Sequence, residues 1–234
     1  MFMKRLSKKT VYLFTMLFDS IAVSVAISLG ILDGNPLEHL KEKGFLTLIS
    51  FSQLLAISLL LLTVFFISMN RERNARFVWG NPSILWAILS FGFLFLAIDE
   101  RYEVHEKIDY IIHHIFSLQE TGITDRIDDL VIAFYGLIGL AILYLYRDEL
   151  KKYRQAFFFI KSGFILLFSM IFLDSLSNRD DILKLLIENG SFVKTIRIWI
   201  SILEDSLKIF AEGYFLVGFY VILDKAIGLR ASQK

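Results

Sequence analysis

The sequence predicts an all-α protein, a polytopic bundle of about six transmembrane helices that forms one integral membrane domain over residues 1–234. Hydrophobic residues make up 56% of the chain and its mean hydropathy is +0.59, more apolar surface than a soluble core of this length can bury. Only two prolines occur, Pro36 and Pro82, both beside glycine or asparagine in predicted short loops. This scarcity predicts long uninterrupted helices.

A helix needs about 20 mostly apolar residues to cross the hydrocarbon of a bilayer. The segments that meet this criterion are residues 11–32, 44–69, 77–98, 129–146, 155–176 and 197–223. The first follows a basic stretch, as the apolar region of a signal peptide does. It is longer than such a region and lacks a convincing cleavage site, so we expect it to be retained as a span.

The basic residues predict the orientation of these spans, because cytoplasmic loops are enriched in Lys and Arg. The N-terminus, the second and fourth loops and the tail together carry Lys4, Arg5, Lys8, Lys9, Arg71, Arg73, Arg76, Arg147, Lys151, Lys152, Arg154, Lys225, Arg230 and Lys234. The three intervening loops carry fewer basic residues in longer, more acidic stretches. Both termini are therefore predicted to be cytoplasmic, with the protein in a bacterial cytoplasmic (inner) membrane.

Two loops predict further helical structure. Residues 99–118 keep a helical apolar pattern, so we expect the third helix to run on beyond the membrane. A second amphipathic segment, 180–188, is expected at the outer interface and is closed by Gly190.

Composition excludes several function classes. The chain has no cysteine, which rules out disulfides, thiolate metal sites and cysteine nucleophiles. The net charge is +1 and the basic residues lie at the ends of apolar runs instead of forming a patch, so no nucleic-acid partner is expected. The sequence also lacks a His-Glu-x-x-His motif, a nucleophile elbow and a phosphate-binding glycine loop.

Ionisable residues inside predicted spans carry the main functional signal, because such residues are costly in a membrane and usually face the bundle interior. In the orientation above, nearly all of them lie toward the outer side. These residues are Asp19, Asp99, Glu100, Asp174, Glu204, Asp205, Lys208 and Glu212.

The densest run extends from Asp99 to Glu106. On a continuous helix with Asp99 at zero, Glu103 falls at about 40° and Glu106 at about 340°, so these residues share one stripe. Glu100 and His105 fall off this stripe, at about 100° and 240°. Only a kink or another helix could gather all of these side chains at one point.

These acidic groups predict a divalent-metal site that faces outward. The proposed ligands are Asp99, Glu100, Glu103, His105, Glu106, Asp174, Glu204, Asp205 and Glu212. Carboxylates suit Mg, Ca or Mn, and imidazole admits Fe or Zn.

Two readings need no metal. The run from residue 99 to 109 is equally well explained as the solvated end of a helix. In the sixth span Lys208 lies one turn from both Glu204 and Glu212 and could neutralise them as an ion pair. As a separate alternative, Asp19, Asp174 and Glu212 could form steps of an ion or proton pathway, to which Lys208 could also belong.

The segment Leu96-Ala97-Ile98-Asp99-Glu100, continuing to His105-Glu106, resembles a motif in uncharacterised bacterial multi-span membrane proteins. The resemblance covers about a dozen residues and implies no known activity. It implies that the acidic and histidine residues of this run act together.

Three functions therefore compete. The first is a divalent-metal-dependent membrane enzyme acting on a lipid or other amphiphile, the second a cation channel or ion-coupled transporter, and the third a non-catalytic membrane subunit or sensor. The sequence does not decide whether the protein is an enzyme. The predicted partners are the lipid bilayer and a protein or second copy packed through small residues, namely Gly136, Gly139, Gly213 and Gly218.

Overall fold

The computed structural model describes residues 6–41, 43–71, 81–117, 127–177 and 190–232. Within these ranges the chain consists of helices and turns and contains no strand, which confirms the predicted all-α class. The helices are α1 (Lys8–Leu32), α2 (Phe45–Arg71), α3 (Ile84–Tyr102), α4 (Val104–Phe116), α5 (Ile127–Leu145), α6 (Arg147–Leu150), the 3₁₀ helix η2 (Lys151–Ala156), α7 (Phe157–Ser177) and α9 (Gly190–Ala231). The amphipathic segment predicted at 180–188 lies outside the described residues.

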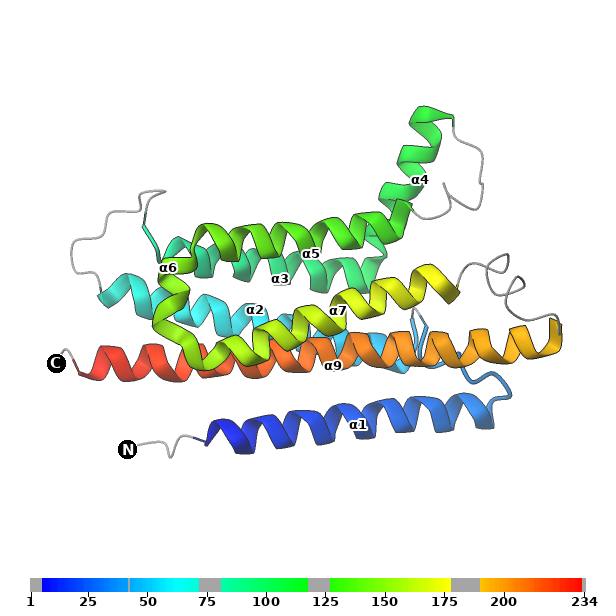
Figure 1. The fold of residues 1–234 in the computed structure, drawn as a ribbon, viewed down its shortest axis with the longest axis horizontal. Coiled ribbons are helices and arrows are strands. Elements are labelled where there is room, and N and C mark those ends of the chain that lie inside the picture. The colour runs from blue at the N-terminus through cyan, green and yellow to red at the C-terminus, as the bar shows by residue number, and fades with distance from the viewer. Residues whose placement is uncertain (1–5, 42, 72–80, 118–126, 178–189, 233–234) are drawn as a thin grey trace.

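The helices α1, α2, α3, α5, α7 and α9 lie along one long axis (Figure 1). The start of α1 and the end of α9 lie at the same end of this bundle, together with α6 (Figure 1). The end of α3, the start of α5 and the start of α9 lie at the opposite end.

Four helical stretches are long and apolar enough to cross a membrane: Lys8–Leu32, Phe45–Met69, Arg147–Ser175 and Phe192–Ala231. They coincide with the first, second, fifth and sixth predicted spans. A further apolar stretch, Leu130–Leu145 in α5, is shorter. The structure is thus compatible with a multi-pass membrane protein.

The surface of α1 has the character of a lipid-facing helix. Phe14 is 70% exposed, and Leu13, Leu17, Phe18 and Ile21 are also exposed. Soluble monomers rarely expose contiguous apolar surface on this scale, whereas a bilayer covers it without cost. The buried side of the same helix carries Thr15 and Asp19, so the polar residues of α1 face the bundle.

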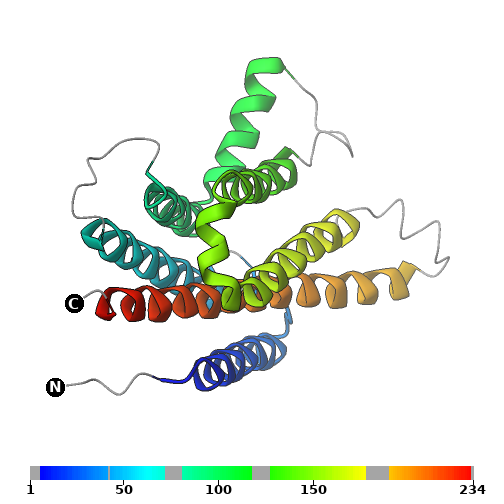
Figure 2. The ribbon, with the colours of Figure 1, turned by 60° about the vertical axis from the view of Figure 1, so that its left-hand side comes forward.

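Two predicted boundaries of the third helix are wrong. The predicted span begins at residue 77, but α3 begins at Ile84, because Asn81 and Pro82 form a turn in which the Asn81 Oδ1 accepts the Ser83 N–H at 2.8 Å. The helix was also expected to run on beyond the membrane within the helical pattern of residues 99–118. Instead it ends at Tyr102, and α4 turns away from the bundle axis (Figures 1 and 2).

The break between α3 and α4 is at Glu103, which has φ 54° and ψ 50°. A left-handed conformation costs a residue other than glycine about 1–2 kcal/mol. Asp99 offsets this cost, since its backbone oxygen accepts the Glu103 N–H at 2.7 Å and its Oδ1 accepts the His105 N–H at 2.7 Å. The side chain of Asp99 therefore caps the first turn of α4.

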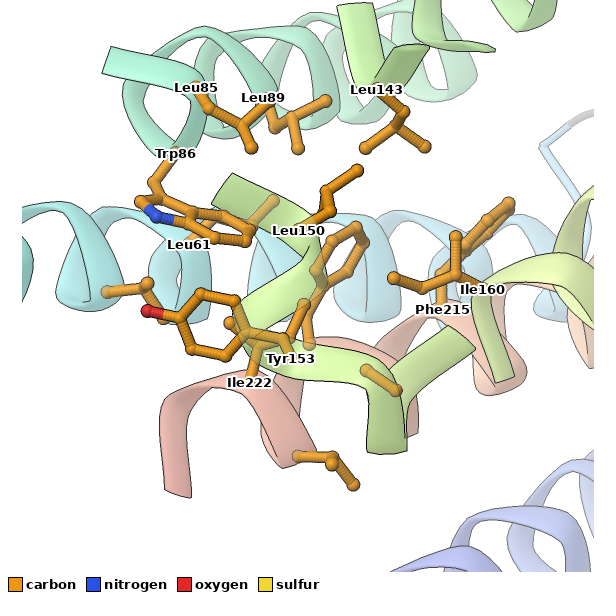
Figure 3. Close-up of a cluster of buried hydrophobic side chains, with 14 of the residues drawn as sticks. Leu61, Leu85, Trp86, Leu89, Leu143, Leu150, Tyr153, Ile160, Phe215 and Ile222 are labelled. Carbon is orange, nitrogen blue, oxygen red and sulfur yellow. The ribbon is translucent and has the colours of Figure 1, made fainter. Parts of the chain in front are cut away.

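The largest core joins α2, α3, α5, α6, η2, α7 and α9 (Figure 3). Within it, Trp86 and Tyr153 meet edge to face, with ring centroids 5.2 Å apart. The helix α9 packs against α1, α2, α7 and η2, so it connects this core to the N-terminal helix.

The predicted small-residue contacts occur within the chain. Gly136 and Gly139 of α5 face Phe168 and Phe164 of α7, and Gly218 of α9 faces Ile160. These glycines allow close helix packing inside one protomer.

Candidate functional site

A cluster of buried polar side chains lies where α1, α2 and α9 meet. We call it the carboxylate cluster, and it comprises Asp19, Ser50, Gln53 and Glu212. Asp19 and Ser50 are fully buried, and Gln53 and Glu212 are each 6% exposed. The Gln53 Nε2 donates a hydrogen bond to the Asp19 Oδ1 at 2.5 Å, and the Ser50 hydroxyl donates to the Glu212 Oε1 at 2.7 Å. The helix α2 thus bridges two acidic residues from opposite ends of the sequence.

Local sequence explains how the cluster forms. Ser50 and Gln53 are three residues apart on α2, so they lie on the same face of the helix. Gly213 follows Glu212 on α9, and a Cβ added there would collide with the Asp19 Oδ2. The missing side chain of Gly213 therefore makes room for the Asp19 carboxylate beside the α9 backbone.

Three oxygens of the cluster have no hydrogen-bond donor among the described residues. They are the Asp19 Oδ2, the Gln53 Oε1 and the Glu212 Oε2, and each is inaccessible to solvent. A buried acceptor without a partner costs about 1–3 kcal/mol, and more if it is charged. A proton on a carboxyl group, or a bound cation, would supply the missing partner for these oxygens.

A second group of charges lies one turn away along α9. The Lys208 Nζ binds the Glu100 Oε1 of α3 at 2.9 Å, with both side chains mostly buried. Lys208 is also close enough to Asp205 and Glu212 for their charges to act on it. The sequence offered Glu204 and Glu212 as its partners, but the closest carboxylate is Glu100, which only tertiary packing brings near.

Three further residues of the Asp99–Glu106 run, Asp99, Glu103 and His105, are paired at the junction of α3 and α4. The Asp99 Oδ2 lies 3.1 Å from the His105 Nδ1, and the Glu103 carboxylate lies 3.0 Å from the Lys43 Nζ. The side chain of Glu106 is exposed. The kink therefore brings His105 to Asp99, but it separates Glu106 from the stripe that a continuous helix would form.

The structure does not gather the predicted metal ligands at one point. Within the ranges described above, no group of three or more His, Cys, Asp or Glu residues could hold a metal ion. Asp174 lies in α7 near enough to Asp205 for its charge to act there, and Glu204 is half-buried. The divalent-metal site therefore has no support in these residues, because Glu100 and Glu103 lie against lysines and Asp99 serves as a cap.

Sequence reasoning identified Asp19, Lys208 and Glu212 as embedded polar residues but did not assign Ser50 and Gln53 to the site. The available signal was their spacing, since two polar residues three apart in a predicted span lie on one face of its helix. The spacing does not identify the helices that this face contacts.

Comparisons with known proteins add a family. Searches of curated proteins and of solved structures each found no match. The DUF8692 family, described as a domain of unknown function, matches residues 2–223, which is nearly the whole chain. The chain is therefore a member of the DUF8692 family.

Proposed function

We propose that this protein is a cation-translocating membrane protein, either a proton conduit or a proton-coupled transporter, and that the carboxylate cluster is its proton-binding site. The observation that carries the proposal is the set of three unpartnered buried oxygens contributed by Asp19, Gln53 and Glu212. Buried carboxylates of membrane proteins pair with one another or mark the route of an ion.

The proposed topology has six spans with both termini in the cytoplasm. Its support is the placement of the start of α1 and the end of α9 at one end of the bundle (Figure 1) and the course of α3 and α5 alongside the four long apolar helices. The positive-inside rule favours the end that carries Arg147, Lys151 and Lys152 as the cytoplasmic one. The assignment to a bacterial inner membrane rests on the motif resemblance alone.

Lys208 gives the proposed site a way to respond to proton binding. When the proton of the carboxylate cluster is on Glu212, Glu212 holds no charge and Lys208 interacts chiefly with Glu100. When the proton leaves, Glu212 becomes a second anion one turn from Lys208. When Glu212 loses its proton, the Lys208 ammonium is therefore attracted both to Glu100 of α3 and to Glu212 of α9. Proton binding at Glu212 is in this way coupled to the contact between α3 and α9.

The hypothesis of a metal-dependent enzyme has less support than the proposal of proton translocation. It requires ligands from several helices at one point, and the described residues form ion pairs instead. The proton pathway requires only carboxyl groups that can change charge inside the bundle, and the carboxylate cluster supplies two, Asp19 and Glu212.

The test is proton flux in proteoliposomes that contain a trapped pH-sensitive dye, with a potassium diffusion potential as the driving force. We expect flux above that of empty vesicles for the wild type and for Glu106→Gln, which removes an exposed carboxylate. Asp19→Asn and Glu212→Gln, which keep the shape of the side chain but cannot release a proton, are expected to lose it. Wild-type flux equal to that of empty vesicles under every gradient would eliminate the proposal.

A further inference from the structure

A large apolar groove lies on the side of the bundle between α5 and α7 and reaches α6. Its volume is about 1070 Å³, at the upper end of the range for small-molecule sites. Its base includes Leu143, Leu150 and Ile160, which also belong to the core in Figure 3. The residues of the carboxylate cluster do not line it.

The charges of the groove all have the same sign. Arg147, Lys151 and Lys161 line it, and no acidic residue does. Lys151 pairs with Asp148, whereas the Arg147 guanidinium lies 4.8 Å from the ring centroid of Tyr144 and so stays over the groove. Lys161 is exposed one turn into α7, although it lies in a predicted span. These cations stand near the end of the groove formed by α6 and the start of α7.

We infer that this groove binds one anionic phospholipid, with its acyl chains along α5 and α7 and its phosphate between Arg147 and Lys161. The apolar walls match acyl chains, and the two cations match a phosphate head group. Basic pockets between membrane helices recognise anionic head groups in this way. This inference is independent of the proposed proton site.

Snorkelling gives Lys161 a general reason to lie at this depth, because a long side chain can reach the interface from within a span. A snorkelling lysine alone would not distinguish anionic from zwitterionic lipids. Two cations, each contributing as juxtamembrane cations typically do, give a preference on the order of thirtyfold for the anionic lipid.

The experiment is native mass spectrometry of the detergent-purified full chain with equal amounts of phosphatidylglycerol and phosphatidylcholine. We expect one phosphatidylglycerol per chain to be retained, with a preference on the order of thirtyfold. The double variant Arg147→Gln, Lys161→Gln is expected to lose the preference. The matched control Arg230→Gln removes an exposed cation at the same end of the bundle and is expected to keep it.

A second variant tests the groove itself without changing charge. Ile165 is 55% exposed in the groove wall, and Ile165→Trp should fill part of the volume and weaken phosphatidylglycerol binding at least severalfold. Equal retention of both lipids by the wild type would overturn the inference. So would a monodisperse double variant that still prefers phosphatidylglycerol, or competition by soluble glycerol phosphate as strong as that of the whole lipid.

Discussion

Replacing Gly213 with alanine tests how closely Asp19 approaches α9. The new Cβ would overlap the Asp19 Oδ2 and would lie 3.1 Å from the Met16 side chain and 3.2 Å from that of Thr15. Because α1 packs against α9 at this point, the Asp19 carboxylate must move. Its displacement breaks the hydrogen bond with Gln53.

The magnitude follows from three contributions. Overpacking in a well-packed interior costs about 1–3 kcal/mol. Leaving the buried Gln53 amide without its acceptor costs about 1–3 kcal/mol more. Alanine in place of glycine inside a helix stabilises the folded state by about 1 kcal/mol. The net expectation for Gly213→Ala is a loss of about 1–5 kcal/mol in the free energy of unfolding.

Thermal unfolding of the detergent-solubilised protein provides the assay, and Gly92→Ala is the matched control. Gly92 also lies in a helix, but a Cβ added there meets no atom within 4 Å, so the control should be neutral or stabilised by up to about 1 kcal/mol. For a chain of this size, about 2 kcal/mol lowers Tm by roughly 4–8 °C. Asp19→Ala should partly rescue Gly213→Ala, since it removes the clashing group. Equal Tm values for Gly213→Ala and Gly92→Ala would refute the close approach of Asp19 to α9.

Two further predictions concern the neighbouring elements. Lys208→Met leaves Glu100 without its cation and should lower the free energy of unfolding by about 2–4 kcal/mol. Adding Glu100→Gln should restore most of this loss. Additive losses in the double variant would show that the pair does not interact. Glu103→Gly should stabilise the α3–α4 junction by up to about 1 kcal/mol, because glycine takes the left-handed conformation freely. Glu106→Gly, at an ordinary helical position, should destabilise by about the same amount, and a stabilisation by both variants would argue against strain at Glu103.

The apolar runs predict the helices well because length and hydropathy are local properties. The spans predicted at 11–32 and 155–176 agree with Lys8–Leu32 and Phe157–Ser177 to within three residues. Side-chain partners are less accessible, since they depend on how helices pack. The helical angle of Glu100 shows that it leaves the Asp99 stripe, but nothing in the sequence identifies Lys208 as its neighbour.

The kink at Glu103 shows where a local rule fails. A continuous helical pattern through this region predicts one helix, and glutamate carries no signal for a left-handed residue. The stabilising partner is Asp99, whose carboxylate caps a helix that starts after the break. Asp99, one of the predicted metal ligands, therefore has a structural role, and the kink separates Glu106 from it.

The length of α9 sets the depth of the proposed site in the membrane. From the exposed Arg197 to the exposed Lys225 this helix extends about 42 Å, close to the ~40–45 Å thickness of a bilayer with its head groups. Glu212 lies near the middle of that stretch. In the proposed orientation, a proton that reaches Glu212 from either side crosses about half of the transmembrane potential, worth about 1.1 kcal/mol per 100 mV. Occupancy of the carboxylate cluster would therefore respond to voltage as well as to pH.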